Sequence, residues 1–101
     1  MKPEPLTGQA LAAALTTLPH WSGDTTRITR TVRLPPAAAA AVLASVQRTA
    51  DELDHHPVVT SVGDAVTFEV WTHWVGAVTA KDLALAAEID RLVGPDAAPA
   101  G

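Results

Sequence analysis

Four histidines are the residues of this sequence best suited to proton transfer near neutral pH. An imidazole has an unperturbed pKa of about 6.5, so the same side chain can give or take a proton under physiological conditions. His55 and His56 are adjacent and are followed by Pro57, whereas His20 and His73 stand alone. The chain has no cysteine, which excludes disulfide bonds and thiolate metal sites. The chemistry to consider first is therefore acid/base catalysis by histidine.

The elements around the histidines predict that three of them meet. Two alternating segments, 58–62 and 66–72, are joined by a Gly-Asp pair that suits the positive backbone dihedrals of a tight hairpin. His55 and His56 precede the first strand, and His73 follows the second. Antiparallel pairing therefore returns His73 toward the two adjacent histidines. Taken alone, the three histidines would also fit surface or capping roles.

The alternation of the second strand predicts on which side His73 lies. Four residues share the side that faces the core: Val66, Phe68, Val70 and Thr72. His73 is then expected on the opposite side, where it is not a core residue. We expect His55, His56 and His73 to line one pocket, and we expect His20, beside Trp21, to lie at the surface outside it.

Two carboxylates are predicted to lie near the adjacent histidines. Asp51 comes four residues before His55, and Glu52 comes four residues before His56, a helical spacing that allows side-chain contact. Such contact favours the charged imidazolium, as does a position at the C-terminus of a helix. The alternative is that both acids only form a solvated helix end.

The other elements are predicted from hydrophobic periodicity and from the glycine and proline residues that end helices and strands. Helical spacing predicts helices over 7–18, 35–53 and 80–93, and alternation adds a strand over 26–34 to the hairpin. Arg30 is the one interruption on the apolar side of that strand, and a weaker strand is possible near Trp21. The fold class is α+β, an antiparallel β-sheet of about four strands with three helices packed on one face. The tail, 94–101, is expected to be frayed.

Length and composition fit one domain over residues 1–101, with an ordered core over about 6–93. Apolar residues make up 48% of the chain and charged residues 18%, which argues against disorder. The formal charge of -4 and the scattered basic residues argue against direct nucleic-acid binding. No apolar run is long enough for a membrane span and no secretory signal is recognisable, so a cytoplasmic location is expected.

These residues resemble the pterin-4a-carbinolamine dehydratase family. The family pattern stands here, in order, as Asp51, His55-His56-Pro57, Thr72-His73, Val75-Gly76-Ala77-Val78-Thr79 and Asp82. The N-terminal half matches too, with Leu18-Pro19-His20-Trp21 and the strand Ile28-Thr29-Arg30-Thr31-Val32. A lone His-His-Pro would be weak evidence, but an ordered set at matching separations is specific. The resemblance covers about residues 6 to 93.

The resemblance implies a hydro-lyase that removes water from a 4a-hydroxytetrahydropterin and forms a quinonoid dihydropterin. It implies His55, His56 and His73 as catalytic residues, with neither a metal nor a redox cofactor. We assign His56 and His73 to the acid/base pair and His55 to binding and orienting the pterin, although the sequence leaves open which histidine does which. Five further positions are expected to bind substrate: Asp51, Pro57, Thr72, Trp71 and Trp74. Either tryptophan could stack on the flat pterin ring.

Alternative interpretations remain open. The resemblance also implies association into a homodimer or homotetramer, and a member of the family could serve as a binding or dimerisation module without turnover. Trp74 could be an interface or core residue instead of a pocket wall. A three-histidine zinc site is a further possibility, although the sequence offers no recognised ligand spacing such as His-x-x-x-His.

Overall fold

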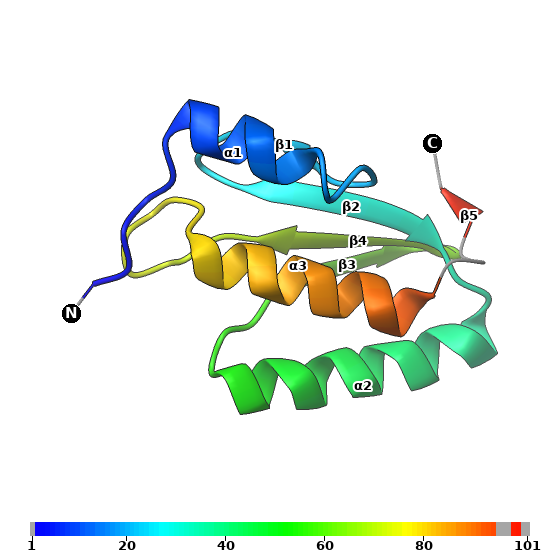
Figure 1. Cartoon of the computed structure of the whole chain (residues 1–101). Helices are drawn as coiled ribbons and strands as arrows, with labels where there is room; N and C mark the ends of the chain where they lie inside the picture. The colour runs from blue at the N-terminus through cyan, green and yellow to red at the C-terminus, as the bar shows by residue number, and fades with distance from the viewer. Residues whose placement is uncertain (1, 95–97, 100–101) are drawn as a thin grey trace.

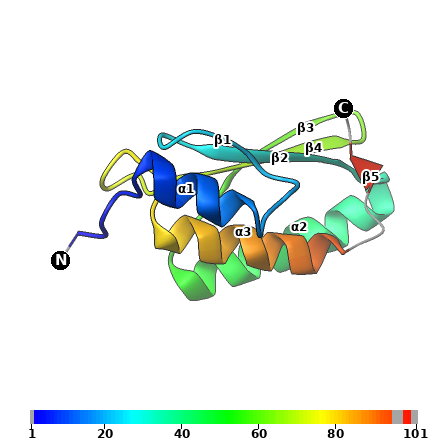
Figure 2. The ribbon, with the colours of Figure 1, turned by 45° about the horizontal axis from the view of Figure 1, so that its top comes forward.

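The computed structural model describes residues 2–94 and 98–99. The elements follow one another as α1 (Gly8–Leu15), β1 (Ser22–Gly23), β2 (Ile28–Arg33), α2 (Pro36–Leu53), β3 (Val58–Val62), β4 (Ala65–Val70), α3 (Ala80–Val93) and β5 (Ala98–Pro99). Four antiparallel strands lie in the order β1-β2-β4-β3, and the three helices cover one face of this sheet (Figures 1 and 2). The expected α+β class is confirmed.

Strict alternation builds the two central strands, β2 and β4. Along each strand every second residue is buried against the helices, and the residues between them lie on the open face of the sheet. The register pairs Ile28 with Val70 and Val32 with Val66, so apolar side chains of the two strands meet on the same face. Phe68 lies between them and is fully buried. The core therefore sits between this sheet and the three helices.

The hairpin forms at the predicted place. Val62 pairs with Ala65, which leaves Gly63 and Asp64 as a two-residue loop. Gly63 has a φ of 61°, and no positive φ occurs at Asp64. A positive dihedral at the first loop residue alone is the arrangement of a type II′ turn, which glycine adopts without steric cost.

Arg30, the interruption on the buried side of β2, is explained by an ion pair inside the fold. Its Nη1 lies 2.5 Å from Oδ1 of Asp90 on α3, and the Trp21 indole Nε1 donates to the same oxygen at 2.8 Å. Arg30 is only 7% exposed, so its charge needs this partner. Through Asp90, Arg30 and Trp21 join β2, α3 and the segment before β1.

The structure differs from expectation near both ends of the chain, at the end of helix α1 and in the C-terminal tail. Helix α1 ends at Leu15 because the hydroxyls of Thr16 and Thr17 bond back to main-chain carbonyls in the closing turn. The expected frayed tail is wrong at 98–99, which pair with the end of β2 as strand β5. Residues 95–97 and 100–101 lie outside the described part. The possible strand near Trp21 is present as β1.

No helix within residues 2–94 combines the length and the apolar character needed to cross a membrane.

Candidate active site

Three histidines line one pocket of about 380 Å³, and His20 is not among its residues. The lining residues are Pro3, Asp54, His55, His56, Thr72, His73, Trp74 and Lys81. They come from the loop after α2, the turn after β4, the first turn of α3 and the N-terminal arm. The geometric prediction of one shared pocket with His20 outside it is confirmed, whereas the roles of the histidines are not tested by position alone.

The end of helix α2 explains how two adjacent histidines separate. The helix stops at Leu53, and Asp54 adopts a left-handed conformation with a φ of 51°. The His55 N–H then bonds back to the carbonyl of Ala50 at 3.0 Å. A left-handed residue closes a helix C-terminus and turns the chain away from the helix axis. His55 therefore points toward the protein interior, and His56 stays exposed beside the helix end.

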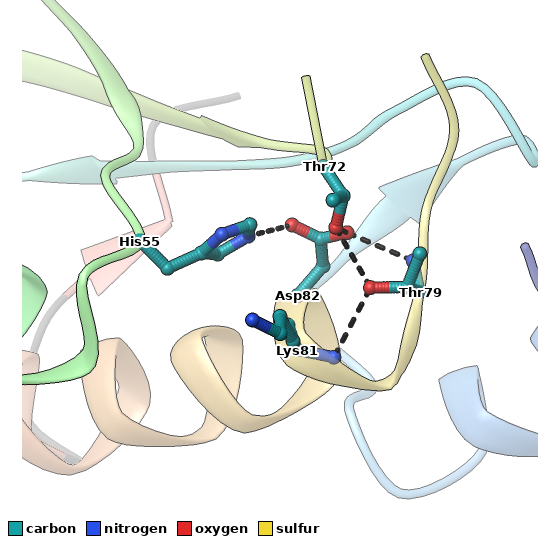
Figure 3. Close-up of polar contacts among 5 residues, drawn as sticks. All are labelled: His55, Thr72, Thr79, Lys81 and Asp82. Carbon is teal, nitrogen blue, oxygen red and sulfur yellow. Dashed lines mark hydrogen bonds and ion pairs between the residues drawn. The ribbon is translucent and has the colours of Figure 1, made fainter. Parts of the chain in front are cut away.

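His55 is held by a buried carboxylate. Its Nε2 lies 2.5 Å from Oδ1 of Asp82, and the two side chains are 11% and 0% exposed (Figure 3). A carboxylate only accepts hydrogen bonds, so His55 donates through Nε2. In a neutral His55 this contact fixes the tautomer and leaves Nδ1 as the nitrogen without a proton.

Asp82 is also the acid of the helix cap. Its Oδ2 accepts hydrogen bonds from the Thr72 hydroxyl and from the main-chain N–H of Thr79, each at 2.8 Å. The Thr79 hydroxyl lies 2.7 Å from Thr72 Oγ1 and accepts from the N–H of Lys81 (Figure 3). Since Thr72 already donates to Asp82, Thr79 donates to Thr72. One buried carboxylate thus joins the start of α3, the end of the β4 segment and His55.

His56 contacts a carboxylate of the preceding helix. Its Nε2 lies 2.8 Å from Oδ1 of Asp51, which also accepts from Gln47 at 3.1 Å. The hydrogen bond from His56 holds the pKa of the Asp51 carboxyl below its usual value, and Gln47 adds to this. Both partners of this pair are largely exposed.

The contacts that helical spacing allows, Asp51 with His55 and Glu52 with His56, are not the ones that form. The helical spacing ends at Asp54, because this residue adopts a left-handed conformation. Asp51 therefore contacts His56, and His55 contacts Asp82 instead. For Glu52, the alternative of a solvated helix end holds. Within the described ranges, the Glu52 carboxylate makes no hydrogen bond or ion pair.

The contact of Asp51 with His56 predicts a pH effect. In His56→Ala, the pKa of Asp51 should rise toward its ordinary value, because the strongest hydrogen bond to the carboxylate is lost. Since the folded-state pKa is lowered, this contact stabilises the fold above the ordinary aspartate pKa and is lost as the pH falls through the folded-state value. Carboxyl ¹³C NMR titration measures it, with His20→Ala as the control. The same Asp51 midpoint in both variants would contradict the assignment.

His73 lies in the turn after β4 and is not a core residue, as expected. It is exposed, while Thr72 before it is buried. Its imidazole stacks on the Trp71 indole, with 4.2 Å between ring centroids and 27° between ring planes. Among the described residues no hydrogen bond or ion pair to the His73 side chain is present.

The five predicted substrate-binding positions divide into two groups. Thr72 and Trp74 line the pocket, and the Trp74 side chain is 58% exposed, as a stacking surface requires. Asp51, Pro57 and Trp71 are not lining residues; Asp51 and Trp71 contact histidines of the pocket instead.

Sequence reasoning missed Asp82, the buried partner of His55, and the lining residues Pro3, Asp54 and Lys81. The spacing of Asp82 from Thr79 indicates a helix cap, and that capping box is present. A cap uses only one carboxylate oxygen here, and the second oxygen is the one that reaches His55. The signal that could have identified Asp82 is its place in the family pattern together with a buried histidine in need of an acceptor.

A larger hollow of about 510 Å³ lies beside the site and contains no histidine. It is formed by residues 3–7, Ala10 and the start of α3, and it shares Pro3 and Lys81 with the histidine pocket. Within the described ranges, no group of three His, Cys, Asp or Glu side chains is arranged to hold a metal ion.

Known proteins resemble this chain over nearly its whole length. The family profile described as Pterin 4 alpha carbinolamine dehydratase matches residues 4–92. A Streptomyces coelicolor protein, provisionally named pterin-4-alpha-carbinolamine dehydratase, is 44% identical over 91% of this chain and 93% of its own length. A Nocardia farcinica protein with the same provisional name is 37% identical over 91% of this chain and 98% of its own.

A solved structure from Brucella melitensis, described as a transcriptional coactivator/pterin dehydratase, superposes with a TM-score of 0.85. It is 26% identical, and the alignment covers 90% of this chain and all of the other. Fold, family profile and relatives therefore agree with one another on the family. The chain belongs to the pterin-4-alpha-carbinolamine dehydratase family.

Proposed function

We propose that this protein removes water from a 4a-hydroxytetrahydropterin and releases a quinonoid dihydropterin, by general acid/base catalysis with histidine. The observation that carries the proposal is the single pocket lined by His55, His56 and His73. Trp74 at its wall supplies an aromatic surface of the kind that stacks on a flat heterocycle. Membership of the family supports the same reaction class.

The reaction breaks one carbon–oxygen bond and removes one proton. The hydroxyl on C4a leaves as water after it accepts a proton from an acid, and a base takes a proton from a ring nitrogen while a carbon–nitrogen double bond forms. The substrate loses one water in total and no electrons are exchanged. An acid and a base that both work near neutral pH are therefore sufficient, and the proposed reaction uses no metal or redox cofactor.

The partners of the three histidines suggest how the roles are divided. His55 is fixed by buried Asp82, which suits a residue that binds and orients the pterin. His56 donates a hydrogen bond to the Asp51 carboxylate and is exposed to the pocket, and we assign it as the acid. His73 faces no carboxylate among the described residues, and we assign it as the base. Both acid and base are exposed enough to exchange protons with water.

A dehydration assay with chemically generated carbinolamine tests the proposal. The rate must be corrected for uncatalysed dehydration, which itself depends on pH. If one histidine gives a proton while another takes one, kcat/KM should rise and then fall as the pH increases across the neutral range. The two apparent pKa values of this profile describe the pair of histidines and not either residue alone. A flat profile would rule out the two-histidine mechanism, and no turnover at any pH would overturn the proposed activity.

A second candidate function is protein binding, which the description of the Brucella melitensis structure as a coactivator favours. Strand β3 is the outer strand of the sheet on the side opposite β1, and it exposes Val58, Val59 and Val62. An outer strand with apolar side chains offers a surface for association. We propose a homodimer or homotetramer, to be measured by light scattering after size exclusion.

A cytoplasmic location stays a prediction.

A further inference from the structure

Trp71 and His73 are placed to interact by the geometry of an extended chain. Residues two apart in such a segment project to the same face and are separated by roughly 7 Å along the backbone. Here the two ring centroids are only 4.2 Å apart, so the side chains lean together into a stack. The interplanar angle of 27° is close to the offset-stacked arrangement that aromatic rings prefer.

Trp71 is anchored to the sheet rather than to the pocket. The Arg27 guanidinium carbon lies 5.4 Å from the centroid of the Trp71 ring, in cation–π contact. Arg27 is itself paired with Glu69 on β4 at 3.1 Å. The pocket is lined by the next three residues along the chain and not by Trp71. The indole is therefore a fixed surface behind His73.

His73 needs such a surface because nothing else in the described part of the chain restrains its ring. The backbone is well held, since Thr72 and Ala77 form a bridge and the Gly76 N–H bonds to the Thr72 carbonyl at 2.9 Å. An exposed side chain on a fixed backbone still samples several staggered rotamers. A carboxylate orients His55, and another orients His56. For His73, the Trp71 indole takes over this orienting role.

We propose that Trp71 is a positioning residue, which holds the His73 imidazole in its place at the pocket and does not itself contact the pterin. The inference rests on the proposed function, because it assigns Trp71 to the orientation of the proposed base. It also replaces the expectation that Trp71 stacks on the substrate.

Trp71→Leu should lower kcat about 2- to 12-fold and leave KM nearly unchanged, since an aromatic pair contributes this much to holding one arrangement. Trp71→Phe keeps an aromatic surface and should restore most of the rate. Trp74→Leu is the matched comparison, because Trp74 lines the pocket, and it should raise KM instead. Circular dichroism and thermal melting verify that each variant is folded.

NMR tests the stack without any turnover. The His73 ring protons should be shifted upfield by the ring current of the aromatic side chain at position 71, the indole in the wild type and the phenyl ring in Trp71→Phe. This shift should disappear in Trp71→Leu. The resonances are assigned by comparison with His73→Gln. This measurement decides the positioning role even if the proposed dehydratase activity fails.

Three results would overturn the inference. A wild-type protein without the upfield shift has no stack. An unchanged kcat in Trp71→Leu, with the shift lost, means that the stack does not serve the reaction. A raised KM with an unchanged kcat in Trp71→Leu means that Trp71 contacts the pterin directly, as Trp74 is expected to do.

Discussion

His73→Ala should lower kcat/KM about 10²- to 10⁴-fold, the usual loss when a general acid or base is removed. The side chain is exposed, lies off the core and stacks on the Trp71 ring. Its removal should therefore change the free energy of unfolding by no more than about 1.5 kcal/mol, the most that an aromatic pair contributes. The dehydration assay gives the first quantity, and urea denaturation gives the second.

His20→Ala is the matched control for this variant. His20 is also exposed, but it lies outside the pocket. The variant should keep wild-type turnover. If His73→Ala turned over as fast as His20→Ala, His73 would have no part in the chemistry, and the acid/base pair would have to be sought among the other pocket residues.

Local pattern was sufficient to predict the fold. The alternation of β2 and β4, the Gly-Asp loop and the Thr79 cap each determine an element through interactions within a few residues. Of the sheet order, only the pairing of β3 with β4 follows in this way, because the two strands of a hairpin pair with each other. Strand β5 could not be predicted this way, because its pairing with β2 is non-local and its sequence is rich in alanine and proline.

The candidate site was predictable only in part for the same reason. The hairpin brings His73 back to His55 and His56, and this depends on local geometry alone. The carboxylate partners depend on the left-handed turn at Asp54 and on the approach of α3, a contact between residues 27 apart in sequence. No periodicity encodes that contact, so helical spacing indicated the wrong pairs.

Asp82→Ala should destabilise the fold by about 2–4 kcal/mol, the largest effect on stability that we expect from a change in the pocket region. The variant leaves the Thr79 N–H, the Thr72 hydroxyl and His55 Nε2 without their common acceptor. Leaving a buried donor unsatisfied costs about 1–3 kcal/mol, and loss of a helix cap costs about 1 kcal/mol. Part of this is recovered, because Thr72 can still bond to Thr79 and His55 is not fully buried.

At about 4–8 °C per kcal/mol for a chain of this size, Tm should fall by roughly 8–32 °C. Glu88→Ala is the matched control, since Glu88 lies on the same helix but makes a surface ion pair with Arg91 at 2.7 Å. Such exposed pairs contribute little, so this variant should melt within about 3 °C of the wild type. If the two variants melted together, Asp82 would not be the acceptor that joins α3 to His55.

Asp82→Asn separates the effect on folding from the effect on His55. The amide keeps one acceptor oxygen, which can still serve the Thr79 N–H and the Thr72 hydroxyl, so much of the stability should remain. Its NH₂ group then faces His55 Nε2, two donors oppose each other, and the imidazole must rotate or change tautomer. Misplacement of a group that orients the substrate should lower kcat/KM about 10- to 100-fold in a protein that is still folded. A folded Asp82→Asn variant with wild-type turnover would show that the contact with Asp82 serves stability alone.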